Sequence, residues 1–397
     1  MARARVLYYL GAGASANALP VVDEIPERFG LFLAIARYRY VIGGANSELI
    51  ERFLTAIIAV CLTLKRKRSI DTYAKELWLR NEKINIYDER LRSINEDNIP
   101  KTKNESITAY NLLKSILAFY FIWLERRHDR DFIEDISMEK LIDYFDNHEI
   151  EFTDTAGGYE IEHKLNAPSI SYPVRKDIIK MLKEFDKKPD DKKPIDDRYV
   201  NFLTDVLERG TPTPKFPKDK IKIISWNYDN QFELACRELN MDKDFYNNEI
   251  NPNLHQINGK FHRYDEFKFL QLFDVLGDIL KDSGINFAWE KDKYKNFDKE
   301  VEEKIGKDSF NHIVIIGYSF PFANREIDRM ILNRYGWRRN LKTRKIDSIP
   351  DKVYVVVPNE EEFNNIKERI MSLADITDGD RIIHITDTKN FFIPNIL

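Results

Sequence analysis

The residues best suited to chemistry follow a short apolar run near the N-terminus. The chain reads RVLYYLGAGAS over residues 5–15, so Gly11 and Gly13 come directly after a predicted strand. Glycines at a strand end let the chain turn tightly, and their amide groups can face an anion, helped by the positive end of a following helix. The pattern therefore predicts a site for a phosphate-bearing ligand. A purely structural tight turn is the alternative interpretation.

The same glycines satisfy the pattern G-x-G-x-x-A, which is typical of dehydrogenases that bind a dinucleotide. In those folds a second strand ends in Asp or Glu about 20 residues further on. The corresponding stretch here reads RFGLFLAIARYRYVIGGANSE and has no acidic residue at the end of a clear strand. The pattern alone is therefore weak evidence for a dehydrogenase.

A second polar loop follows another apolar run. The chain reads IKIISWNYD over residues 221–229, so Asn227 and Asp229 come at the end of a predicted strand. Amide and carboxyl groups in that position can hydrogen-bond to sugar hydroxyls or orient a water molecule. Asp229 is equally suited to cap the predicted helix 230–239, which would be a structural role. Both interpretations stay open for this loop.

A third polar loop follows the apolar run within HIVIIGYSF, residues 312–320. Gly317 allows a close approach of the backbone at the strand end, and Ser319 offers a hydroxyl there. Asn324, a few residues later, is suited to cap a helix. Ligands of open α/β sheets bind at the carboxyl ends of the strands, so we expect the three loops to converge at that edge.

Five short runs are predicted to form strands. Each is rich in Val and Ile and almost continuously apolar, as in the strands of a parallel sheet that is covered on both faces. They are residues 5–10, 221–229, 312–320, 352–358 and 381–386. Helical patterns follow at residues 230–239, 324–335 and 360–373. This alternation predicts an α/β fold with a Rossmann-like open parallel sheet.

The middle of the chain has a different pattern. Segments such as SELIERFLTAIIAVCLTL and ITAYNLLKSILAFYFIWLERR carry apolar residues at helical spacing. We therefore predict a large helical insertion after the first strand–loop unit, at residues 31–199. The Rossmann-like domain is then discontinuous and consists of residues 1–30 and 200–397.

The composition excludes several classes of protein. The net charge of -4 gives no general attraction to nucleic acid, so no direct nucleic-acid binding is expected. Only two cysteines are present, Cys61 and Cys236, which excludes a disulfide framework and a zinc site built from four cysteines. No apolar run reaches the length of about 18 residues that a membrane span needs. We expect a protein of the cytoplasm that has no membrane association.

In this order the three loops resemble those of the sirtuin-like NAD-binding family, and in particular its bacterial branch that acts in antiphage defence. GAGASANALPVVDEI resembles the family's G-A-G-x-S loop, ISWNYDNQFE its strand–N-Y-D–helix element, and IIGYSFPFANREIDRMI its G-Y-S strand end. The resemblance covers the predicted sheet domain in outline and only loosely the helical middle. The zinc-binding cysteines of the sirtuin protein deacylases are missing, so no zinc is expected.

The resemblance implies roles for the first loop. Gly11, Ala12, Gly13 and Ser15 would cradle the pyrophosphate of NAD and its riboses. The Asp-Phe-Arg that follows this loop in the deacylases is absent, and the chain reads Asp-Glu-Ile over residues 23–25 instead.

The resemblance also implies roles for the later loops. Asn227 would face the nicotinamide ribose, and Asp229 would hold that loop in place. Gly317 and Ser319 would meet the ribose on the adenine side. Asn359, which ends the run VYVVVPN, would lie near the adenosine. Arg198 and Tyr199, just before the second strand, are weaker candidates for contact with the same pocket.

The catalytic base is the third departure from the family. The family usually has His-Gly downstream of N-Y-D, whereas the segment LHQINGKFHRY has Asn258 at that position, flanked by His255 and His262. Histidine is the usual general base near neutral pH, and asparagine can only orient a water molecule or a hydroxyl. Either one of the flanking histidines serves, or cleavage needs little help from a base. Surface or core packing is the structural alternative for both histidines.

The function that the resemblance implies is hydrolysis of NAD+ to ADP-ribose and nicotinamide, as an effector that depletes NAD during phage infection. Such proteins commonly form homo-oligomers and often work with a partner such as a HerA-type ATPase or an Argonaute-like protein. The alternative is a sensor that binds NAD, ADP-ribose or a cyclic derivative without cleaving it. Acyl or ADP-ribosyl transfer and a dehydrogenase are more distant alternatives.

Overall fold

The computed structural model describes residues 5–19, 73–79, 109–126, 195–208, 214–261, 271–274, 282–287, 301–306, 309–339 and 346–397, with isolated positions between these ranges. The chain divides into two compact units. The first unit consists of Met1–Val21, Ile195–Lys260 and Asn286–Leu397, and the second of Val22–Pro194 and Phe261–Ile285. The predicted sheet domain of 1–30 and 200–397 therefore differs from the first unit mainly in the segment Phe261–Ile285.

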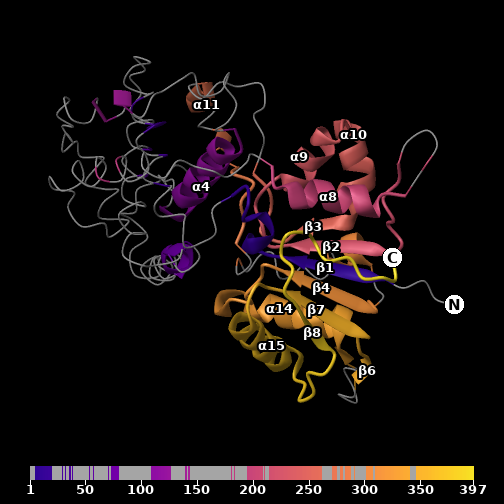
Figure 1. Cartoon of the computed structure of the whole chain (residues 1–397). Coiled ribbons are helices and arrows are strands. Elements are labelled where there is room, and N and C mark those ends of the chain that lie inside the picture. Colours follow the sequence, from indigo (N-terminus) through magenta and orange to yellow (C-terminus); the bar gives the residue numbers. More distant parts are fainter. Residues whose placement is uncertain are drawn as a thin grey trace, which may run out of the picture. The chain divides into compact units, whose positions relative to one another are not determined.

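A six-stranded parallel sheet forms the centre of the first unit (Figure 1). Its strands are β1 (Val6–Leu10), β2 (Ile221–Ser225), β3 (Leu254–Gln256), β4 (His312–Ile316), β7 (Lys352–Val356) and β8 (Ile382–Ile385). They lie in the order β3-β2-β1-β4-β7-β8, and each neighbouring pair runs parallel. The predicted α/β fold with a Rossmann-like parallel sheet is confirmed.

Helices cover both faces of this sheet, which explains why its strands are apolar almost throughout. Figure 1 shows α8 (Asp197–Val206) and α9 (Gln231–Glu238) on one side and α14 (Arg325–Ile331) and α15 (Glu360–Ala374) on the other. Successive side chains of a strand point to opposite faces. Tyr8 accordingly packs among α8 and α9, with its ring 4.9 Å from that of Phe202, and Tyr9 packs among the residues of α14 and α15.

The order of the strands fixes where a ligand can bind. Numbered along the chain, the six strands lie in the order 3-2-1-4-5-6, which is the order of dinucleotide-binding Rossmann folds. The chain moves outward in one direction from β1 to β3 and in the other direction from β4 to β8. The connections after β1 and β4 therefore diverge, and a crevice at their carboxyl ends is the usual ligand site in such sheets.

Shorter elements complete the first unit. They are η1 (Ala12–Ser15), α10 (Lys243–Phe245), η2 (Tyr246–Ile250), η3 (Asn251–Asn253), η4 (Phe322–Asn324) and η5 (Leu332–Gly336), and the antiparallel pair β5 (Arg338–Arg339) and β6 (Ile346–Ser348). The sequence predicted neither this pair nor β3. It predicted α9, α14 and α15 with bounds close to those observed, except that α14 ends at Ile331 and continues as η5.

The second unit contains the helices α4 (Ala109–Arg126) and α11 (Gln271–Asp274). Aromatic rings pack around α4, where the ring of Tyr120 lies 4.9 Å from Phe29 and 5.5 Å from Phe32. The Ser115 hydroxyl donates to the carbonyl oxygen of Ile279 at 3.1 Å, which ties the segment 261–285 to this helix. None of the helices in the described part of the chain combines the length and the apolarity that crossing a membrane requires.

Candidate functional site

The loops after β1 and β4 are in direct backbone contact. A Cβ atom added to Gly317 would lie 2.4 Å from the Cα of Gly13, and one added to Gly11 would lie 2.5 Å from the Gly317 oxygen. Gly317 also has a φ of 59°, in the left-handed region that other residues adopt only at a cost. Close packing of the two backbones therefore favours glycine at all three positions, and at Gly317 the backbone conformation favours it as well.

The hydrogen bonds of these loops correct one prediction. The Gly11 amide donates to the Ile316 oxygen and the Gly13 amide to the Gly317 oxygen, each at 3.0 Å. The Ala14 amide donates to the Gly11 oxygen at 2.8 Å. The Gly11 and Gly13 amides therefore join the first loop to the segment after β4, the Ala14 amide bonds within the first loop, and none of the three faces an anion as we predicted. Ala12, at the start of η1, is the exposed residue of this loop.

A buried polar cluster lies beside the glycines and is centred on Ser15. The Ser15 hydroxyl donates to Asp229 Oδ2 at 2.7 Å and accepts from Asn227 Nδ2 at 3.0 Å, and the Tyr199 hydroxyl lies 2.8 Å from it. A hydroxyl has one proton and two lone pairs. Because its proton goes to Asp229, both Asn227 and Tyr199 must donate to Ser15. All three hydrogen-bonding positions of this hydroxyl are then filled.

The cluster also fixes the orientation of the Asn227 side chain. Since Ser15 can only accept from it, the amide nitrogen faces Ser15 and the amide oxygen Oδ1 points away from the cluster. The backbone amide of Asn227 donates to the Ser225 hydroxyl at 3.1 Å, which holds the loop to the end of β2. The Asn227 side chain is buried, and no described residue donates a hydrogen bond to its Oδ1.

Asp229 combines the two roles that its sequence position allows. Its Oδ1 accepts from the amide of Gln231 at 3.1 Å and so caps the start of α9, while its Oδ2 accepts from Ser15. The carboxyl group is buried, and this burial raises its pKa to about 6, although the hydrogen bond from Ser15 acts in the opposite direction. Asp229 is thus ionised near neutral pH and places a negative charge close to Asn227, with which it shares the Ser15 hydroxyl.

A buried ion pair between Arg198 and Asp196 supports the first loop. Arg198 bonds to both carboxylate oxygens of Asp196, with its Nε 2.9 Å from Oδ1 and its Nη2 2.6 Å from Oδ2. The same Nη2 donates to the carbonyl oxygens of Gly13 and Ala14, each at 3.1 Å. Asp196 in turn accepts from the backbone amide of Asn17 at 3.1 Å. The pair therefore fixes both ends of η1 against the start of α8.

Two polar residues next to the cluster come from the end of β3 and the turn that follows it. Gln256 donates to the carbonyl oxygen of Asp229 at 2.7 Å, and Asn258 donates to the carbonyl oxygen of Trp226 at 2.8 Å. Both side chains thereby brace the loop after β2. The Asn258 carbonyl accepts from the amide of Asn286 at 2.8 Å. Asn258 is buried, so its position agrees with a role in shaping the site and gives no group that could accept a proton.

The structure brings only some of the predicted site residues together. Ser15, Asn227 and Asp229 form one hydrogen-bonded cluster, and Gly11 and Gly13 pack against Gly317 beside it.

The other predicted residues lie elsewhere. His255 pairs with Ile224 in the sheet and is buried, and it points to the opposite face of β3 from Gln256, so it does not join the cluster and its role as a base stays a prediction. Ser319 is exposed and lines a groove on the face of α14 and α15. Asn359 caps α15, where its Oδ1 accepts from the amide of Glu362 at 2.8 Å. His262 lies outside the described residues.

Three polar residues of the site are more prominent than the sequence indicated. Tyr199 and Arg198 sit in an unremarkable helical pattern, and only the folded chain shows that they bond to the glycine loop and to Ser15. Gln256 was missed because β3 was not predicted. The segment LHQIN gave no clear strand signal, because His255 and Gln256 are adjacent polar residues and the pattern does not alternate.

Comparisons with known proteins give no family for this chain. No protein-family model matches it, and no curated protein sequence matches it either. Among the residues that the structure describes, no three His, Cys, Asp or Glu side chains gather as a metal site would require. The site is thus characterised by its geometry alone, as a buried serine–tyrosine–asparagine–aspartate cluster at the carboxyl edge of a Rossmann-type sheet.

Proposed function

We propose that the protein hydrolyses NAD+ to ADP-ribose and nicotinamide. The observation that carries the proposal is the position of Asn227, whose side-chain nitrogen is held by Ser15 at the carboxyl end of β2 while its oxygen has no donor among the described residues. The strand order supports a dinucleotide as the ligand, because ligands of sheets with this order usually bind at the carboxyl ends of the central strands. The three motifs that resemble the sirtuin-like family support NAD in particular.

The chemistry needs positioning more than it needs a strong base. Nicotinamide leaves NAD+ as a neutral molecule, and the sugar passes through an oxocarbenium-like state that water captures. The carbonyl oxygen of Asn227 would accept a hydrogen bond from a ribose hydroxyl or from that water. The buried negative charge of Asp229, which follows Asn227 in the same loop, would favour the positive sugar. The proton released on addition of water passes to solvent, so no residue has to hold it.

The physiological role rests on the same resemblance. We propose an effector of antiphage defence that is held inactive until infection and then depletes NAD in the cytoplasm. Homo-oligomers, and a partner such as a HerA-type ATPase or an Argonaute-like protein, belong to this proposal. These features predict that activity depends on the assembly state of the protein.

The test is nicotinamide release from NAD+ by the purified protein, alone and with the product of the neighbouring gene. Asn227→Ala is expected to lower the rate by about 100-fold or more, since it removes a group that acts on the developing charge. Asn201→Ala is the matched control, because Asn201 is an exposed asparagine on α8 whose side chain bonds to Asn390, away from the Ser15 cluster. No nicotinamide in any assembly state, or equal rates for both variants, would refute the proposal.

One observation favours a second function, a sensor that binds NAD or ADP-ribose intact. Asn258 occupies the position where the family usually has a histidine, and His255 lies on the opposite face of the sheet. Calorimetry with NAD+ separates the two functions. Tight binding of NAD+ that is recovered uncleaved, with and without the partner, would establish the sensor. Turnover in either condition would exclude it.

A further inference from the structure

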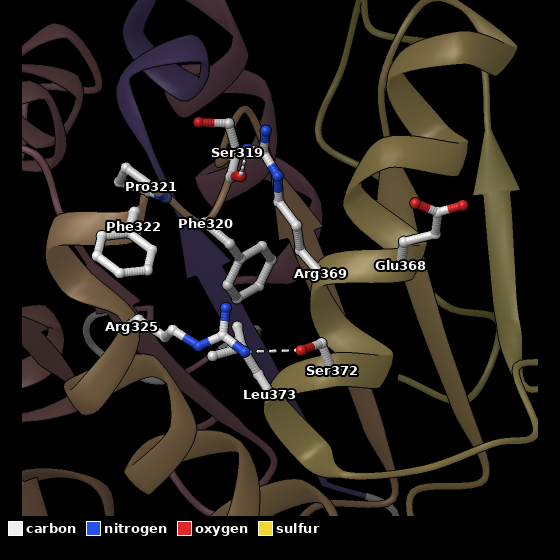
Figure 2. A pocket seen from close by; sticks show the side chains of 9 residues that line it. All are labelled: Ser319, Phe320, Pro321, Phe322, Arg325, Glu368, Arg369, Ser372 and Leu373. Atoms are coloured by element: carbon white, nitrogen blue, oxygen red, sulfur yellow. Dashed lines mark hydrogen bonds between the residues drawn. The ribbon is translucent and has the colours of Figure 1, made fainter.

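A groove lies on the face of α14 and α15, on the other side of the sheet from the Ser15 cluster. Its volume is about 510 Å³, within the usual size range of small-molecule sites. Figure 2 shows the side chains of one wall coming from the segment after β4 and those of the other wall from α15. The lining residues are Ser319, Phe320, Pro321, Phe322, Arg325, Glu368, Arg369, Ser372 and Leu373.

The chain after β4 is bent to form this groove. Phe320 has a φ of 52°, a left-handed conformation that costs a non-glycine residue about 1 kcal/mol or more. The cost is offset by burial of its ring, which stacks on Tyr9 with the centroids 5.6 Å apart. Because the ring of Phe320 points inward, its neighbours Ser319 and Phe322 are turned to the surface. The two walls are joined there by hydrogen bonds.

Two arginines line this groove, and each bonds to a residue of the opposite wall. Arg325 donates through Nη2 to the Ser372 hydroxyl at 2.7 Å, and Arg369 donates through Nη1 to the Ser319 carbonyl. Each guanidinium has five N–H groups, so most of them remain available. Neither forms an ion pair with a carboxylate of the described residues. The carboxylate of Glu368 lies apart from both guanidinium groups in Figure 2.

An aromatic ring is exposed beside these arginines. Phe322 is 82% exposed, the most exposed large apolar side chain among the described residues. Phe322 is the first residue of η4, which ends directly before Arg325, and both side chains lie on the same wall of the groove (Figure 2). An exposed ring next to cationic groups is the arrangement with which proteins stack a base and hold its phosphates.

We propose that this groove binds a nucleotide. Its phosphates would bond to Arg325 and Arg369, in the geometry that favours guanidinium groups for phosphate, and its base would stack on Phe322. The groove is distinct from the candidate active site, since it lies on the opposite face of the sheet and draws half of its lining from α15. It therefore gives the protein a second ligand site beyond the proposed hydrolysis of NAD+.

The test uses ADP as the probe and equilibrium dialysis of labelled ADP against the full chain. The double variant Arg325→Gln with Arg369→Gln is expected to lose one bound ADP per chain. Phe322→Ala is expected to weaken binding at that site by about 10-fold, as loss of a stacking partner does. Arg329→Gln is the matched control, because Arg329 is an exposed arginine of α14 outside the groove, and its ADP binding stays within about 2-fold of the wild type.

Several results would overturn the proposal. The first is an unchanged number of bound ADP molecules in the double variant. The second is loss of ADP in Asn227→Ala but not in the arginine variant, which would assign the bound ADP to the candidate active site. The third is pyrophosphate that binds as tightly as ADP and ignores Phe322→Ala, which would show a phosphate site without recognition of a base. Circular dichroism verifies that each variant is folded.

Discussion

The contact between the first and third loops predicts a large effect of Gly317→Ala on stability. The alanine Cβ would lie 2.4 Å from Gly13 Cα, so the loops must separate by roughly 1 Å to reach ordinary van der Waals contact. This separation weakens the 3.0 Å hydrogen bond from the Gly13 amide, worth about 1 kcal/mol. The left-handed φ adds about 1–2 kcal/mol. We therefore expect unfolding in urea, followed by circular dichroism, to show a loss of about 2–4 kcal/mol.

Two other glycines separate these contributions. Gly306 has a φ of 95°, but its added Cβ would lie 3.7 Å from the nearest atom, so Gly306→Ala tests the backbone conformation alone. An added Cβ at Gly379 would lie 2.4 Å from Lys367 Cε, which can move, so Gly379→Ala tests a close contact with a flexible side chain. Each should cost less than Gly317→Ala. If Gly317→Ala costs no more than Gly306→Ala, the two loops are not in backbone contact and the argument for a joined site fails.

Two further predictions concern buried polar groups. Tyr199→Phe removes one hydrogen bond that Ser15 accepts and keeps the ring, so kcat for nicotinamide release should fall about 10-fold at unchanged KM in steady-state kinetics. Equal kcat values would leave Tyr199 a packing role only. Burial raises the pKa of Asp328 from 3.8 to about 8, although Tyr9 and Tyr318 bond to it. The folded state then holds a proton that the unfolded state has lost, so this group's stabilising contribution declines as pH rises from about 4 to about 8. Asp328→Asn should show a smaller decline in urea unfolding across that range, and an equal decline would contradict the assignment to Asp328.

The sheet could largely be predicted because its strands are buried on both faces. Five of the strands are runs of four or five residues that are apolar except at isolated positions, namely β1, β2, β4, β7 and β8. Such runs are too short for a typical helix and are typical of strands that are buried on both faces. β3 could not be predicted in this way. It has only three residues, two of them His255 and Gln256, and it exists because β2 offers an edge to pair with. A short strand of that kind depends on tertiary pairing rather than on its own sequence.

The candidate site was predictable in its strand-end residues and not beyond them. Ser15, Asn227 and Asp229 follow strands directly, so parallel pairing alone brings them to one edge. Tyr199 comes from a helix, and its contact with Ser15 depends on how α8 packs on the sheet. The position of His255 could not be predicted for a related reason. The face to which a strand residue points depends on the register of the strand, which the sequence did not reveal.

The hydrogen-bond inventory of one hydroxyl links the charge of the site to its chemistry. Ser15 gives its single proton to Asp229 only while that carboxyl is ionised, and the pKa of about 6 keeps it so at neutral pH. In that state Asn227 has to donate to Ser15, so its side-chain oxygen points away from Ser15. Once Asp229 holds a proton it can donate to Ser15 instead, which frees the serine proton and removes the constraint on Asn227. Under the proposed function, the buried carboxylate would act on the ligand through the direction of an amide group that it does not touch, which gives a physical reason for an acid to be buried next to an asparagine at this edge of the sheet.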